Sequence, residues 1–104
     1  MNLRYATPAL VDLDTIAENI QSNSSRSAMR FLEAAKNTAE RLLMFPEFGA
    51  VFETDEPELQ DLRVCLVEGF EKYLLFYRIR GDDVVVTRIL HGYRDLTKAL
   101  KESP

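Results

Sequence analysis

The spacing of apolar residues changes once along this chain, close to residue 62. Before that point, in the segments 8–21 and 28–43, apolar residues recur every three or four positions, which is the pattern of amphipathic helices. Beyond it, three short runs rich in β-branched and aromatic residues follow one another, which is the pattern of strands. Helices followed by consecutive strands indicate an α+β domain, in which the helices pack on one face of an antiparallel sheet.

Two helices are expected in the first half of the chain. The first covers 8–21, with Thr7 as a candidate N-cap and Pro8 at the first helical position. The serine-rich segment 22–25 ends this pattern and offers the next N-cap. The second helix follows it and ends before Pro46. Because the connection is short, the two helices should form an antiparallel hairpin.

Three strands are expected in the second half, at 62–67, 73–80 and 84–91. The segments EGFEK and GDD separate them, and both are suited to hairpin connections. The three strands should therefore form an antiparallel meander.

Shorter segments complete the expected order. Residues 2–6 (NLRYA) are a candidate opening strand, and residues 46–61 are expected to form an irregular, solvated loop. Leu96 and Leu100 share one face of a short final helix within the tail RDLTKALKES. The order is β-α-α-β-β-β-α, in a single domain over residues 1–104.

The net charge of −4 and the sequence pI of about 5.0 bear on possible partners. Nucleic-acid binding depends on Lys and Arg side chains that neutralise phosphates. An acidic chain meets that need only where its cations gather, so direct nucleic-acid binding is not expected from the overall charge. The arginines nevertheless favour the C-terminal half, which leaves room for a local cationic patch.

A single cysteine and the lack of long apolar runs favour a cytoplasmic protein. Cys65 cannot form an intramolecular disulfide or a thiolate metal cluster by itself, and we expect it to be a small residue within a strand. No run reaches the roughly 18 apolar residues of a membrane helix, and the N-terminus lacks the pattern of a signal peptide. We therefore expect a reducing cytoplasm and no membrane partner.

Cofactor motifs are missing from the sequence. It has no glycine-rich phosphate loop, no spacing of His, Asp and Glu that suits a metal, and no G-x-S-x-G nucleophile elbow. Neither a cofactor nor a metal is expected.

The arginines of the three strands are the first candidate site. Arg63, Arg78 and Arg88 lie one in each strand. If they converge, their guanidinium groups can hold a phosphate or a carboxylate bidentately. Alternatively, each arginine pairs with a nearby acid and holds the sheet together. The candidate acids are Glu68, Glu71, Asp82 and Asp95.

The segment RILHGYRDL (88–96) is the second candidate site, because it holds the only histidine of the chain, His91. Beside Arg94, its imidazole can act as a general acid or base, or it can hydrogen-bond the backbone at a corner. Gly92 is expected to permit a sharp change of chain direction there. Asp95 is a candidate N-cap for the final helix.

Five segments spread over the chain are informative when taken together. They are the pattern Tyr5…Ala9…Asp12-Leu13…Ile16, FPEFG (45–49), Leu62-Arg63, LLFYRI (74–79) and RILHGYRDL (88–96). In this order the chain resembles the RelE/ParE superfamily of toxins from bacterial type II toxin–antitoxin pairs, often called plasmid-stabilisation proteins. The last segment resembles the ParE-like branch most specifically. The resemblance implies a RelE/ParE-like fold, with an N-terminal strand, a helical hairpin on an antiparallel meander and a short C-terminal helix.

The superfamily has two main modes of action. RelE-like members are ribosome-dependent mRNA endonucleases that use basic side chains on the sheet and a tyrosine in the tail. ParE-like members are understood to inhibit DNA gyrase without catalytic chemistry of their own. By this resemblance Arg63 and Arg94 match nuclease positions, whereas two other basic positions hold Cys65 and Leu74, and the tail tyrosine falls at about Leu100.

RNA cleavage needs separate groups to activate the 2′-hydroxyl, stabilise the phosphate and protonate the leaving group. A nuclease could be built here only from Arg63, His91 and Arg94. The resemblance therefore favours a ParE-like toxin that inhibits DNA gyrase by protein binding and is neutralised by a cognate antitoxin. The candidate target-binding residues are Arg63, Arg78, Arg88, His91 and Arg94.

We expect an amphipathic antitoxin segment to fill a groove between the helix hairpin and the sheet. The sequence leaves two assemblies possible, a homo-oligomer and a toxin–antitoxin hetero-oligomer. Two alternative functions also remain: a RelE-like mRNA endonuclease, which would make the chain an enzyme, and an inactive module that retains only antitoxin binding.

Overall fold

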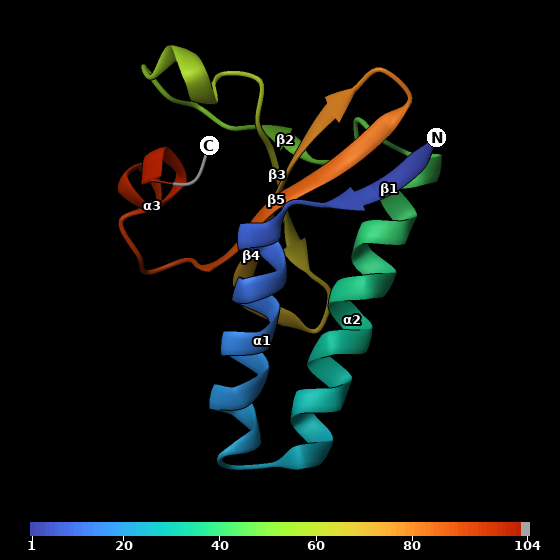
Figure 1. Cartoon of the computed structure of the whole chain (residues 1–104), viewed down its shortest axis with the longest axis vertical. Helices are drawn as coiled ribbons and strands as arrows, with labels where there is room; N and C mark the ends of the chain where they lie inside the picture. The colour runs from blue at the N-terminus through green and yellow to red at the C-terminus, as the bar shows by residue number, and fades with distance from the viewer. Residues whose placement is uncertain (103–104) are drawn as a thin grey trace.

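The computed structural model describes residues 1–102 (Figure 1). Its elements are β1 (Asn2–Tyr5), α1 (Thr7–Gln21), α2 (Ser25–Met44), β2 (Ala50–Val51), the 3₁₀ turn η1 (Pro57–Leu59), β3 (Arg63–Val67), β4 (Phe70–Arg80), β5 (Asp83–His91) and α3 (Leu96–Glu102). The predicted α+β class is confirmed; Ser103 of the predicted tail helix lies outside the described residues. Within residues 1–102, no helix has the length and apolar character needed to cross a membrane.

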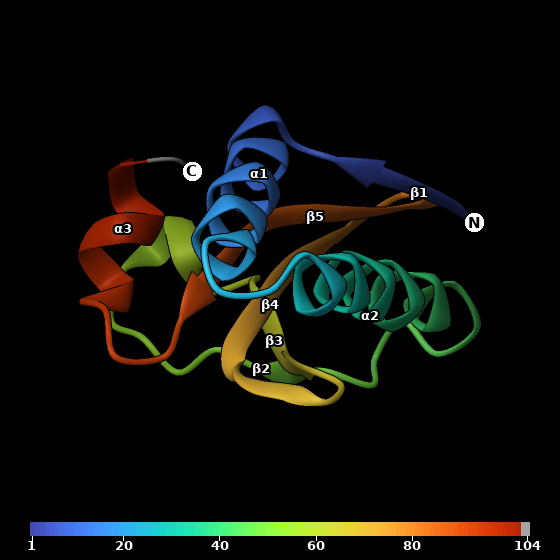
Figure 2. The ribbon, with the colours of Figure 1, turned by 90° about the horizontal axis from the view of Figure 1, so that it is seen from below.

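Five strands form one sheet in the order β1-β5-β4-β3-β2. β3, β4 and β5 are the predicted antiparallel meander, and β1 pairs with β5 in parallel. Figures 1 and 2 show α1 and α2 lying side by side as the expected antiparallel hairpin. In Figure 1, η1 and α3 lie together on the other side of the molecule from α2.

The two faces of the sheet carry two hydrophobic cores. The larger core packs the helix hairpin on the sheet, with Phe31 fully buried in it. Successive side chains of β4 point to opposite faces, so Leu75 and Tyr77 enter this core and Phe76 enters the smaller one. The members of the smaller core are Leu59, Leu62, Phe76, Leu90, Ala99 and Leu100. Residues of η1 and α3 therefore cover the second face.

The starts of the two long helices are fixed in different ways. Ser24 caps α2 as expected, since its hydroxyl accepts the Ser27 N–H at 3.1 Å. The prediction of a Thr7 cap is wrong, because Thr7 is already helical and the N-cap is Ala6, which has no capping side chain. Ala6 donates its N–H to the carbonyl of Val86 at 2.9 Å, so pairing with β5 sets where α1 begins.

The prediction of an irregular loop over 46–61 is wrong in two places. β2 pairs with β3 inside this segment, and η1 buries Leu59 completely. The first hairpin connection is also shorter than EGFEK, because β4 already begins at Phe70. The turn is made possible by Gly69, whose φ of 82° lies in the left-handed region.

Asp12 closes the edge of β5 beyond the point where β1 ends. β1 pairs only with residues 83–86 of β5. Beyond Val86, no strand lies beside the backbone N–H and C=O groups on that edge of β5. There the Asp12 carboxylate accepts a hydrogen bond from the Ile89 N–H at 3.0 Å. It also accepts hydrogen bonds from Nε and Nη2 of Arg88, at 2.7 and 2.9 Å. Arg88 Nη1 donates to the carbonyl of Ala99 at 3.0 Å. One buried ion pair thus joins α1, β5 and α3.

Replacing Asp12 by Ala should lower the free energy of unfolding by about 3–5 kcal/mol, because it leaves the buried Arg88 charge without its partner. Urea denaturation measures this change. Asp14→Ala is the matched control, since Asp14 is an exposed acid of the same helix, and it should change stability by less than about 0.5 kcal/mol. Equal effects of the two substitutions would contradict a stabilising role of the ion pair.

Candidate functional site

Arg63 and Arg88 lie on opposite faces of the sheet. Arg63 is opposite Tyr77, which enters the larger core, and Arg88 is opposite Phe76, which enters the smaller one. Arg63 Nη1 donates to two main-chain carbonyls of the 47–49 segment at 3.2 and 2.8 Å. Hydrogen bonds from Arg88 to its partner carboxylate raise the pKa of the guanidinium, so its charge is permanent but already occupied. The two groups do not converge on one ligand.

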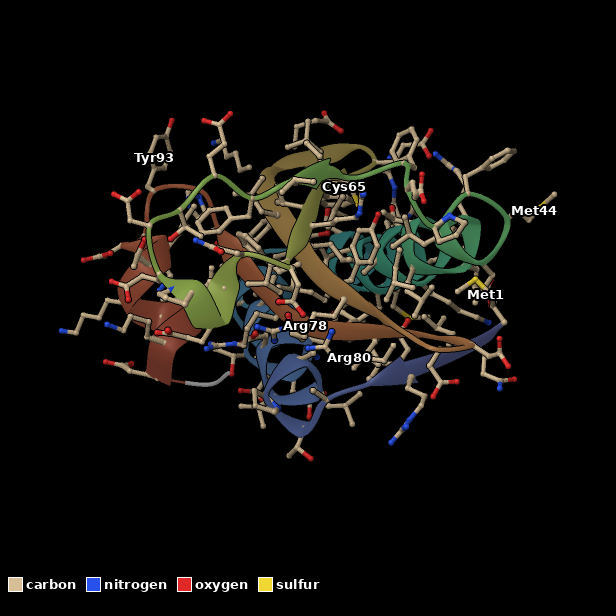
Figure 3. The ribbon with its side chains drawn as sticks, turned by 90° about the horizontal axis from the view of Figure 1, so that it is seen from above. Met1, Met44, Cys65, Arg78, Arg80 and Tyr93 are labelled. Carbon is tan, nitrogen blue, oxygen red and sulfur yellow. The ribbon has the colours of Figure 1, made fainter. Side chains whose placement is uncertain are left out.

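Arg78 and Arg80 share a single acid, Asp61, and Figure 3 shows the two arginines next to each other. Arg78 Nε donates to Asp61 Oδ1 at 2.9 Å, and its Nη2 donates to the Glu58 carbonyl at 2.7 Å. Burial raises the pKa of the Asp61 carboxyl, but hydrogen bonds from both arginines outweigh it and hold the pKa below its ordinary value. Arg78 therefore ties the segment around η1 to β4, through an acid that the sequence reasoning did not consider.

His91 ends β5 at the corner that leads to α3. Its Nδ1 accepts the Tyr93 N–H at 3.2 Å. The imidazole ring lies nearly perpendicular to the Tyr73 ring, with 5.3 Å between the ring centroids. Tyr93 and Arg94 are exposed at this corner, and Figure 3 shows the Tyr93 side chain projecting outward.

The corner does not depend on glycine. Gly92 does not have a positive φ, and a Cβ there would make only ordinary contacts, the nearest being 3.5 Å from the Lys72 carbonyl. The expectation that Gly92 supplies special backbone freedom is therefore wrong. Asp95 does cap α3 as expected, because its Oδ1 accepts the Lys98 N–H at 3.2 Å.

The three residues that a nuclease would need are not brought together. Arg63 is opposite Tyr77 and His91 is opposite Tyr73, so their positions are separated along β4 by about 13 Å. His91 and Arg94 do line one pocket, which they share with α1.

A second hollow, the α2–β3 groove, has a volume of about 380 Å³. It is lined by Thr38 and Arg41 of α2, by Phe48, by Val64, Cys65 and Leu66 of β3, and by Glu68 and Glu71. Two large apolar residues of this lining are accessible, since Phe48 is 63% exposed and Leu66 is 50% exposed. The groove therefore offers an apolar surface with a charged rim.

β3 presents an open edge to this groove. β2 has only two residues, which pair with Arg63 and Val64. Leu66 therefore has no strand beside it on that side. The next donor along this edge, the Glu68 N–H, is satisfied by Thr38 Oγ1 at 3.3 Å. An open strand edge beside apolar side chains is a surface on which another chain can dock.

Tyr77 holds the FPEFG segment (45–49), which contributes Phe48 to the α2–β3 groove. Its hydroxyl donates to the Pro46 carbonyl at 2.6 Å and accepts the Gly49 N–H at 2.9 Å. Burial raises the pKa of this phenol. A Cβ on Gly49 would lie 2.7 Å from the Tyr77 hydroxyl and 3.0 Å from the Val64 carbonyl, so only glycine fits. This contact holds the FPEFG segment, and with it Phe48, against the sheet.

Cys65 is an unreactive residue of the sheet. It is buried in β3, and burial raises its pKa to about 11, so the thiol stays protonated at neutral pH. Among residues 1–102, no group of three His, Cys, Asp or Glu side chains could hold a metal ion.

A family model describing the ParE toxin of the type II toxin–antitoxin system parDE matches residues 3–96. The chain belongs to the ParE toxin family. No curated protein sequence matches it significantly.

Two solved structures are similar to this ParE family member. The first is a chain of the chromosomal ParDE toxin–antitoxin system from P. aeruginosa, with a TM-score of 0.72, 20% identity, and coverage of 88% of this chain and 95% of that one. The second is the conserved hypothetical protein HP0894 from Helicobacter pylori, with a TM-score of 0.50, 13% identity, and coverage of 88% and 93%. At these identities the two likenesses support the ParE fold.

Sequence reasoning expected a groove between the hairpin and the sheet but named none of its residues. The alternation in β3 was the available signal, because exposed Leu66 lies between two buried neighbours, Cys65 and Val67. Asp12 and Asp61 were also missed as arginine partners. No local spacing relates Asp12 to Arg88, which lies 76 positions away.

Proposed function

We propose that this ParE family member is the toxin of a type II pair, that it acts in the cytoplasm by binding DNA gyrase, and that a cognate antitoxin neutralises it. The match to the ParE toxin family over residues 3–96 carries the proposal. The likeness to a chain from a ParDE toxin–antitoxin system supports an antitoxin as partner.

The antitoxin would dock in the α2–β3 groove. An amphipathic segment could cover Phe48 and Leu66 with its apolar side and the open edge of β3 with its backbone. Arg41 and Glu68, an exposed ion pair, and Glu71 would face the polar side of that segment at the rim. This division into apolar floor and charged rim is the usual anatomy of a protein interface.

The arrangement of the basic residues suits binding of a protein target better than it suits RNA cleavage. Arg63 and Arg88 are held by groups of the chain itself, which leaves His91 and Arg94 as the accessible pair. The position that resembles the tail tyrosine of the nucleases is Leu100, and it is buried in the smaller core. A side chain there has no access to a substrate.

Two other functions compete with this proposal. A RelE-like mRNA endonuclease is favoured by one observation, namely that His91 and Arg94 line the same pocket. An inactive module that binds only the antitoxin would use the same groove and lack a cellular target.

Induced expression in bacteria separates the three functions. We expect growth arrest with induction of the DNA-damage response and with intact transcripts. Ribosome-dependent transcript cuts that Arg94→Ala abolishes would contradict the proposal and identify a nuclease. Normal growth in the presence of folded protein would identify an inactive module. Arg26→Ala, which removes an exposed arginine of α2, is the control for loss of charge.

Leu66→Arg should weaken antitoxin binding at least about tenfold while toxicity persists, because the added charge would be buried unpaired in the interface. Calorimetry with the cognate antitoxin measures the affinity, and co-expression measures neutralisation. Leu10→Arg is the matched control, since Leu10 is 48% exposed and Leu66 is 50% exposed, but Leu10 lies on α1. Equal affinities of the two variants would contradict docking in the α2–β3 groove.

A further inference from the structure

A pocket of about 360 Å³, the corner pocket, lies between α1 and the end of β5. Thr15 and Asn19 line it from α1, one helical turn apart, and Tyr73 lines it from β4. His91 and Arg94 line it from the corner that leads to α3. Residues that carry hydroxyl, amide, imidazole and guanidinium groups, from three separate parts of the chain, thus line one hollow.

The electrostatic balance of the corner pocket is positive. Asp12 is the only carboxylate among the described residues that line it, and both of its oxygens are occupied by Arg88 and the Ile89 N–H. Arg94 is exposed and forms no ion pair with any residue of 1–102. A guanidinium at the rim of a pocket whose carboxylate is neutralised attracts anions.

His91 is prepared as a hydrogen-bond donor. Because Nδ1 accepts the Tyr93 N–H, the proton of the neutral ring must sit on Nε2. The Tyr73 ring is nearly perpendicular to the imidazole, and the Tyr93 ring is tilted against it with 5.0 Å between the ring centroids. The imidazole is therefore fixed both in orientation and in the nitrogen that carries the proton.

We infer that the corner pocket binds an oxyanion, either a phosphate or a carboxylate. Arg94 supplies the charge and two parallel donors, and the His91 Nε2–H supplies a neutral donor. Thr15 and Asn19 add donors from α1 that can adapt to the shape of the anion. This binding does not depend on the proposed toxin function, since it is a property of the isolated chain.

Titration of the full chain with inorganic phosphate and, separately, with acetate tests the inference by amide NMR at constant pH and ionic strength. We expect saturable shifts confined to the amides of Thr15, Asn19 and residues 91–95, with a Kd on the order of 1–10 mM. Arg94→Gln should weaken binding about tenfold or more. Arg26→Gln, which removes an equal charge from the exposed face of α2, should leave binding unchanged.

The two titrations also identify the ligand. Saturation by phosphate alone assigns a phosphate site, saturation by acetate alone assigns a carboxylate site, and saturation by both assigns a general oxyanion site. Absence of saturable shifts with either anion would overturn the inference. So would equal binding by Arg94→Gln and the unsubstituted chain, provided the remaining amide spectrum shows that the variant is folded.

Discussion

The Asp12 carboxylate takes the place of a missing strand at the edge of β5, just where β1 has ended. It accepts hydrogen bonds from the Ile89 N–H and from Nε and Nη2 of Arg88. The remaining nitrogen of that guanidinium, Nη1, donates to the Ala99 carbonyl of α3. A buried arginine without its partner is strongly destabilising, so α1, β5 and α3 keep their positions together. The corner pocket also depends on this pair, because Arg88 neutralises Asp12, the one carboxylate that residues 1–102 place at the pocket wall.

The order of the main elements could be predicted because each one carries its own periodic pattern, and Pro46 and the serines before α2 mark the limits of the second helix. β2 and η1 could not be predicted in this way. A strand of two residues has no period, and Leu59 is a single apolar residue in an acidic segment. Its burial becomes evident only when α3 is placed on the second face of the sheet.

Side-chain partners were less accessible to sequence reasoning than elements were. A bulge in the pairing of β4 with β5, between Phe76 and Tyr77, leaves Thr87 without a partner, and Arg88 is then opposite Phe76. That register decides which face Arg88 occupies, and no local pattern reveals it. Arg63, Arg78 and Arg88 are each held by other groups of the chain, and the accessible surfaces are the α2–β3 groove and the corner pocket. These surfaces are built on different elements, so a segment docked on β3 would leave His91 and Arg94 in place.

The central claim is that this ParE family member acts by binding gyrase and not by cutting RNA. Its most direct test adds the purified chain to DNA gyrase in a supercoiling reaction, and in parallel to ribosomes that carry mRNA. The account predicts dose-dependent loss of supercoiling that the cognate antitoxin reverses, with the mRNA left intact. Unchanged supercoiling together with mRNA cleavage at the ribosome would contradict it.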